Sequence, residues 1–200
     1  MKHTKRTVTL ALCGIGLAGC SAWAQEAGKP DNALTCKAAE EVAAHARAPG
    51  VVRQAYTTLM RCPNAGGALA AAWANLPSDS AVLSELAIRS MYIEDRRILE
   101  ATLPLVQIAG TAAAIRRHAL DVVLALYCPS VAVSRSTWAD PVHSSLASQS
   151  DYSQIRGEQP LTASDRQRIV DVFRQLSTTD PDLHWRQLAK RIADDLPMSP

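Results

Sequence analysis

Large aromatic side chains are rare in this chain of 200 residues, which has one Phe, four Trp and four Tyr. Stretches in which β-branched and polar residues alternate are also few, whereas alanine is abundant. The scarcity of strand-forming residues argues against a β-sheet protein. Alanine-rich sequence with apolar residues at helical spacing predicts closely packed helices, so we expect an all-α fold.

Neither sign of charge dominates the chain. Residues 1–24 hold three of the 21 basic residues and none of the 19 acidic ones, so the remainder carries a formal net charge of −1 (18 − 19). A protein that binds the phosphates of nucleic acids has a basic patch or stripe, and no polybasic block remains here. The composition therefore predicts no nucleic-acid partner.

The longest apolar stretch without charge lies at the beginning of the chain. Lys2, Lys5 and Arg6 precede the apolar or small residues 7–19, which is the pattern of a secretory signal. A stretch of about 13 residues is too short for a membrane-spanning helix, which needs roughly 20. Residues 1–24 are therefore predicted to be an export signal, and no later segment predicts a polytopic membrane protein.

Two processing sites compete within this signal. Residues 17–20 (LAGC) resemble the bacterial lipobox, which implies that Cys20 is acylated and becomes the new N-terminus. If this resemblance holds, Ser21 after the Cys implies an outer-membrane lipoprotein that faces the periplasm. The alternative is ordinary cleavage after Ala24, at the A-x-A pattern of residues 22–24, which would give a soluble periplasmic protein.

The rest of the chain divides into four segments. Residues 25–34 form a short polar tether, and residues 35–128 contain six helical stretches that make a core. Residues 129–161 form a Ser-rich loop without helical periodicity, and loops of such length are usually functional or disordered. Residues 162–197 are predicted to form two C-terminal helices that pack on the core.

Apolar residues in the core recur with a period of 32 residues. The small residues Ala55, Ala87 and Ala119 share this spacing. Three further apolar columns keep the same phase: Val51, Leu83 and Ile115; Tyr56, Ile88 and Leu120; Leu59, Met91 and Val123. A small residue between larger apolar ones lets neighbouring helices approach closely, so the period predicts stacked antiparallel helical hairpins.

The segments 51–55 (VVRQA) and 115–120 (IRRHAL) resemble the second helix of HEAT-type α-solenoid repeats. The resemblance covers about residues 35–128 and implies a surface for binding rather than a reaction. The chain departs from the family pattern at Ser84 and Glu85, which replace the basic pair, and at Pro104.

Two cysteines flank the turn at Pro49 and Gly50 at similar distances along the chain. Residues equidistant from a turn lie side by side in a helical hairpin, so Cys36 and Cys62 are predicted to form a disulfide in an oxidising compartment. Two buried free thiols are the alternative. Cys128 is then left over, either as a buried thiol or as one end of an intermolecular bridge.

The sequence predicts no catalytic residue, no metal site and no cofactor. Its histidines do not have the spacing of zinc ligands, and it has no C-x-x-C pair. Asp140, His143, Ser144 and Ser145 have the residue types of a catalytic triad, but no G-x-S-x-G turn accompanies them. The glycines of residues 65–68 (AGGA) could hold an anion at the start of a helix, although a plain turn explains them better.

Four residues are candidates for contacts with a partner protein. Trp138 lies in the Ser-rich loop, where it could anchor an interface or fold back onto the helices. Arg116 and Arg117 form a basic pair, and Arg186 lies on the polar face of the last helix.

We therefore expect a bacterial envelope protein that acts as a protein-interaction module, either a scaffold or a periplasmic inhibitor or immunity-type lipoprotein. Its protein partner is unknown, and acylation of Cys20 would add a lipid anchor. The alternatives are an envelope enzyme such as a cell-wall hydrolase, and a carrier of a small ligand.

Overall fold

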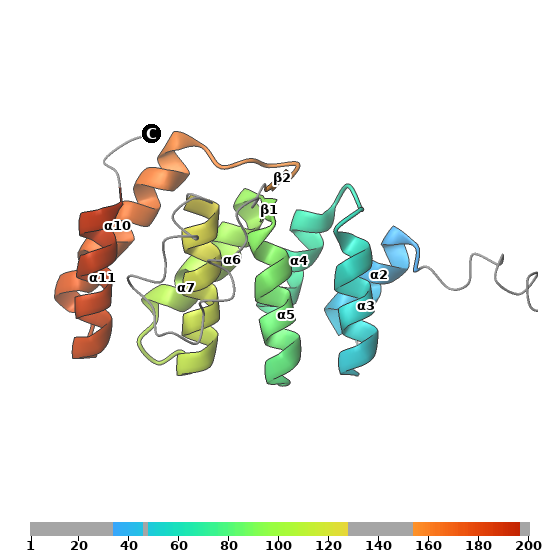
Figure 1. The fold of residues 1–200 in the computed structure, drawn as a ribbon, viewed down its shortest axis with the longest axis horizontal. Coiled ribbons are helices and arrows are strands. Elements are labelled where there is room, and N and C mark those ends of the chain that lie inside the picture. The colour runs from blue at the N-terminus through green and yellow to red at the C-terminus, as the bar shows by residue number, and fades with distance from the viewer. Residues whose placement is uncertain (1–33, 46–47, 128–153, 197–200) are drawn as a thin grey trace, which may run out of the picture. The chain divides into compact units, whose positions relative to one another are not determined.

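The computed structural model describes residues 34–45, 48–127 and 154–196, which form eight helices and two short strands (Figure 1). The helices are α2 (Cys36–His45), α3 (Pro49–Leu59), α4 (Ala65–Ala74), α5 (Ser80–Met91), α6 (Arg96–Gln107), α7 (Ala113–Tyr127), α10 (Ala163–Thr179) and α11 (Leu183–Asp195). The strands are β1 (Ile93–Glu94) and β2 (Ile155–Arg156), which pair in parallel. The predicted all-α class is confirmed, apart from this pair of two-residue strands.

Most helices pack against the next helix along the chain, and most also pack against the next but one. The pairs α2–α3, α4–α5, α6–α7 and α10–α11 are in contact. Helix α4 also contacts both α2 and α6, and helix α5 contacts both α3 and α7. As a result α3, α5 and α7 follow one another as a row (Figure 1). Helix α10 closes the end by packing on α6 and α7.

The alanines with the 32-residue period lie in the contacts between helices. Ala55, Ala87 and Ala119 are 0%, 1% and 0% exposed, on α3, α5 and α7 respectively. A side chain this small lets two helix backbones come close, which explains why the position is buried in all three helices. Another predicted column is less regular, since Val51 is 45% exposed.

Short polar side chains begin several helices by accepting hydrogen bonds from first-turn backbone N–H groups. Asp79 does so for α5 and Asp182 does so for α11. At the start of α10, Thr162 and Asp165 exchange hydrogen bonds in a capping box. Ser164 does not take this role, because α10 begins one residue before it.

Residues that follow the gap at 128–153 satisfy the last backbone carbonyls of α7. Gln154 Nε2 donates to the carbonyls of Ala125 (3.0 Å) and Met91 (2.8 Å). The Arg166 guanidinium donates to the carbonyls of Leu126 and Tyr127, so the C-terminal end of α7 is capped by side chains. The Ser-rich loop was predicted to continue to residue 161, whereas the structure places residues 155–156 in β2.

Candidate functional site

A pocket of about 310 Å³ lies where the α3–α4 connection meets β1 and β2. We call it the Arg61–Arg156 pocket, after the two arginines that help to line it. Its other lining residues are Met60, Cys62, Pro63, Ala65, Gly66, Ile93, Ile155 and Gly157. Most of these are apolar, so the pocket combines an apolar lining with two cationic side chains.

Hydrogen bonds between β1 and β2 build one side of this pocket. Ile155 N–H donates to the carbonyl of Tyr92 at 2.7 Å, and Gly157 N–H donates to the carbonyl of Glu94 at 2.9 Å. Ile155 and Arg156 are both exposed beside the pocket.

A buried carboxylate, Asp95, fixes the backbone beneath the pocket. It is 0% exposed and accepts from Arg97 Nε (3.0 Å, to Oδ1) and Arg97 Nη2 (2.8 Å, to Oδ2). Burial alone would raise the pKa of Asp95, but the hydrogen bonds and the charge of Arg97 outweigh this, so the pKa lies below its usual value. Asp95 is therefore a charged structural group that begins α6, with its Oδ1 accepting from Arg97 N–H.

Arg97 links this carboxylate to two other segments. Its Nη1 donates to Asn64 Oδ1 before α4 (2.9 Å), and its Nη2 donates to Glu158 Oε2 after β2 (3.0 Å). One side chain thus joins the starts of α4 and α6 to the segment that follows β2. Because Asn64 is engaged in this way, its side chain makes no capping bond to α4.

Glycines surround the carboxylate because nothing larger fits there. A Cβ on Gly66 would lie 2.6 Å from the Cβ of Asp95, and a Cβ on Gly157 would lie 2.8 Å from the same atom. A Cβ on Gly67 would lie 2.6 Å from Arg97 Nη1. The prediction of a plain turn at residues 65–68 is wrong: these residues form the first turn of α4 and pack closely around an internal ion pair.

The side chains of Arg61 and Arg156 make no hydrogen bond or ion pair with any residue that the structure describes. The other arginines nearby are engaged: Arg96 lies 3.4 Å from Glu100, and Arg97 binds Asp95 and Glu158. Two cationic groups therefore remain available to a ligand at one pocket. Neither arginine was predicted from the sequence as a site residue, because the two are 95 positions apart (156 − 61) and neither lies in a basic run.

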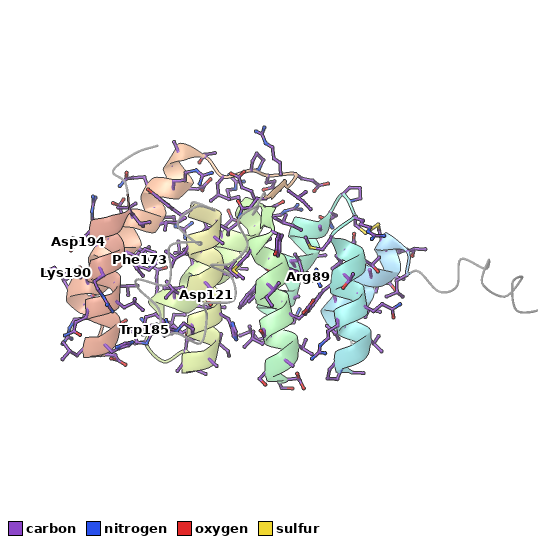
Figure 2. All side chains as sticks on the ribbon, viewed as in Figure 1. Arg89, Asp121, Phe173, Trp185, Lys190 and Asp194 are labelled. Atoms are coloured by element: carbon purple, nitrogen blue, oxygen red, sulfur yellow. A yellow bond between two sulfur atoms is a disulfide. The ribbon has the colours of Figure 1, made fainter. Side chains whose placement is uncertain are left out.

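The prediction that Arg116 contacts a partner protein is wrong, because this residue is only 2% exposed. It forms an ion pair with buried Asp180 and donates through Nε to the carbonyl of Val106 at 2.8 Å. Its guanidinium also lies over the ring of Trp185, 4.1 Å from the centroid. Figure 2 labels Trp185, which belongs to α11. These contacts join α7 to the α10–α11 hairpin, so Arg116 is a structural residue.

The remaining interface candidates fall into three situations. Arg186 is half-buried and donates to the Asp180 carbonyl at 2.6 Å, which also serves the internal junction. Arg117 is half-buried on α7 and stays a prediction. Trp138 lies outside the described residues.

The two cysteines predicted to pair are brought together. The Cα atoms of Cys36 and Cys62 are 5.6 Å apart, the sulfurs are bonded, and the bridge spans 26 positions of sequence. It joins the first residue of α2 to the α3–α4 connection and to the lining of the Arg61–Arg156 pocket. Cys20 and Cys128 lie outside the described residues.

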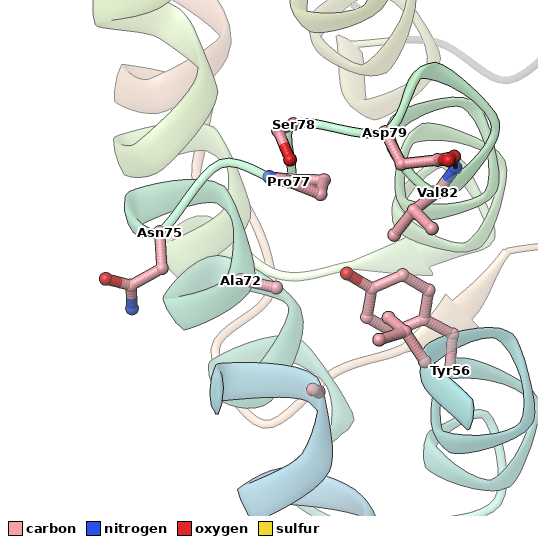
Figure 3. Close-up of a pocket in the computed structure, with 9 residues that line it drawn as sticks. Tyr56, Ala72, Asn75, Pro77, Ser78, Asp79 and Val82 are labelled. Carbon is pink, nitrogen blue, oxygen red and sulfur yellow. Dashed lines mark hydrogen bonds between the residues drawn. The ribbon is translucent and has the colours of Figure 1, made fainter. Parts of the chain in front are cut away.

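A second, much smaller pocket of about 20 Å³ lies between the first two helical pairs (Figure 3). Tyr56 is 1% exposed, and its hydroxyl points into this space without a partner among the residues described. Burial raises the pKa of Tyr56 to about 12. The volume is enough for about one water molecule, so this pocket does not suit a larger ligand.

Within residues 34–45, 48–127 and 154–196, no group of three or more His, Cys, Asp or Glu side chains could hold a metal ion. In the same part of the chain, no helix has the length and apolar character needed to span a bilayer. Asp140, His143, Ser144 and Ser145 fall in the part that the structure does not describe. The chain matches no family model, no curated protein and no solved structure.

Proposed function

We propose that this chain is an exported, membrane-tethered protein-interaction module of the α-solenoid type. The observation that carries this proposal is the packing order of the helices. Helices α3, α5 and α7 contact one another in sequence, and each buries an alanine of the series 32 residues apart, while α4 contacts both α2 and α6. Consecutive helical pairs packed in this way are typical of solenoids, which bind other proteins on their extended surfaces.

The internal ion pairs support a rigid scaffold. Asp95 and Asp180 are both buried, and each is neutralised by an arginine of the same chain. Such pairs hold neighbouring segments in one arrangement, because each buried carboxylate is paired with an arginine from within the fold. This use of buried charge supports a structural role for these groups.

The disulfide supports export. A Cys36–Cys62 bridge is expected to persist in an oxidising compartment such as the periplasm and to be rare in a reducing cytosol. The signal pattern of residues 1–24 and the lipobox at residues 17–20 lead to the same compartment. We propose acylation at Cys20 and attachment to the outer membrane.

Site-specific crosslinking tests the interaction module. A photoreactive residue would replace Gln54 on α3 in one strain and Glu100 on α6 in another, since both side chains are exposed. One position belongs to the series α3, α5 and α7, and the other belongs to the series α2, α4 and α6. We expect one crosslinked species of defined mass from one of these two series and none from the other, because the two series present different surfaces. Absence of any crosslinked species from both positions in native envelopes would refute the proposal.

The intact mass of the native mature protein tests the tether separately. We expect a chain that begins at Cys20 and carries acyl groups, recovered with the membrane fraction. A mass that begins at Gln25 would replace the tether with free diffusion in the periplasm, while the crosslinking experiment would still test the interaction module.

A further inference from the structure

The Arg61–Arg156 pocket lies where the chain enters the fold. Cys62 lines the pocket and is bonded to Cys36, the first residue of α2. Between Cys20 and Cys36 there are 16 residue steps (36 − 20). At roughly 3.4 Å per residue these steps span at most about 55 Å. The acylation of Cys20 proposed above, on which this inference rests, would therefore hold Cys36 within about 55 Å of the anchor.

Two cations at the pocket have no acidic partner in the described part of the chain. Arg61 and Arg156 are both exposed, whereas Arg97 and Arg166 nearby are paired with Glu158 and Glu94. A pocket with two uncompensated positive charges favours an anionic group. Arginine is well suited to phosphate oxygens, because its planar guanidinium donates two parallel hydrogen bonds.

Exposed apolar surface lies beside these cations. Ile155 is 50% exposed, one of four large hydrophobic residues in the described part that are at least 45% exposed. Met60, half-buried, and Ile93, buried, continue the apolar lining. An apolar group between basic side chains is the pattern by which proteins rest on an anionic membrane surface.

We propose that the Arg61–Arg156 pocket binds the phosphate headgroup of an anionic phospholipid in the membrane that holds the tether. Arg61 and Arg156 contact the phosphate, and Ile155 lies against the apolar part of the lipid. Because binding takes place within reach of the acyl anchor, a weak contact is enough, since tethering gives it a high effective concentration. The contact orients this end of the helical stack toward the membrane.

The test uses the full mature chain with Cys20→Ser, which cannot be acylated, so its outcome does not depend on whether the native chain is lipidated. Sedimentation would measure its partition onto phosphatidylcholine vesicles with and without phosphatidylglycerol. Each cation near an anionic surface contributes roughly a fivefold factor in partition. We therefore expect Arg61→Gln with Arg156→Gln to lower partition onto the anionic vesicles by about 25-fold.

The matched control, Arg53→Gln with Arg191→Gln, removes the same net charge from exposed positions on α3 and α11. It should keep most of the wild-type partition. Ile155→Ser should lower partition at high salt, where the apolar contact remains and the charges are screened. Circular dichroism should show that all variants keep their helices.

Three outcomes would overturn the proposal. The first is equal partition of the wild-type chain onto both vesicle types. The second is an equal loss in the control variant, which would indicate a general charge effect. In the third, inorganic phosphate at low concentration displaces the chain from the vesicles, which would assign the pocket to the free ion. None of these outcomes bears on the protein-interaction surface, which the crosslinking experiment tests.

Discussion

Replacing Arg116 with Met should be among the most destabilising single changes in this protein. The substitution keeps the apolar stem of the side chain but removes the guanidinium from buried Asp180. It also removes the hydrogen bond to the Val106 carbonyl and the contact with the Trp185 ring. Leaving one partner of a buried ion pair alone costs roughly 3–5 kcal/mol, so we expect a loss of about 4 kcal/mol in the free energy of unfolding.

Urea unfolding monitored by circular dichroism measures this loss, and two variants make the result specific. Arg117→Met changes the neighbouring, half-buried arginine and should cost less than about 1 kcal/mol. Arg116→Met combined with Asp180→Asn removes both charges and keeps an acceptor for Asp182 N–H, so it should recover at least half of the loss. Equal, small effects of Arg116→Met and Arg117→Met would refute the role of the buried pair.

The pH dependence of the same measurement gives an independent check. Burial alone would raise the pKa of Asp180, but hydrogen bonds from Arg116 and Asp182 and the charge of Arg116 hold it below the usual value. A carboxyl with a lowered pKa stabilises the fold above its unfolded pKa, near 4, and this contribution is lost as the pH falls through the folded pKa. The difference between wild type and Arg116→Met should therefore shrink below about pH 4.

Three other predictions test separate features. Gly66→Ala should lower the free energy of unfolding by about 2–3 kcal/mol through overpacking. Gly50→Ala should raise it by up to about 1 kcal/mol, because a Cβ at Gly50 would meet nothing within 4 Å. Similar melting temperatures for the two variants would contradict this prediction. Tyr56→Phe should remove the absorbance change of a phenol that titrates near pH 12. Because the pKa of Tyr56 is raised in the folded protein, the stability that this group contributes is present below its unfolded pKa, and wild type should lose it between about pH 10 and 12. If Tyr56→Phe instead removes a phenol that titrates near pH 10, the hydroxyl is not buried. Reduction of the Cys36–Cys62 bridge, which spans 26 positions, should cost about 3.5 kcal/mol in the chain-entropy model, and alkylation of both thiols in the non-reduced native protein would show that the bridge is absent.

Local sequence patterns were sufficient for the helices and the disulfide. The apolar periodicity predicted six helices in residues 35–128 and two in residues 162–197, as observed, because a helix must bury one continuous face. The disulfide followed from the symmetry of Cys36 and Cys62 about a helical turn. Both inferences depend on residues that are close in sequence or related by a simple hairpin.

Contacts between distant segments could not be predicted in this way. Arg116 stands next to Arg117 and looks like half of a solvated basic pair, but its partner Asp180 is 64 residues further along the chain. Strand β2 has only two residues, which is too short for an alternating pattern to predict it. The Arg61–Arg156 pocket likewise depends on a strand pairing that no local propensity encodes.

The capping of α7 by later residues affects how freely the protein can change in length. Gln154 binds the Ala125 carbonyl and Arg166 binds the Tyr127 carbonyl, so the chain returns to the place it left. These side-chain contacts hold Tyr127 and Gln154 in place from outside the segment that joins them. A change in the number of residues between Tyr127 and Gln154 therefore need not alter the contacts that cap α7.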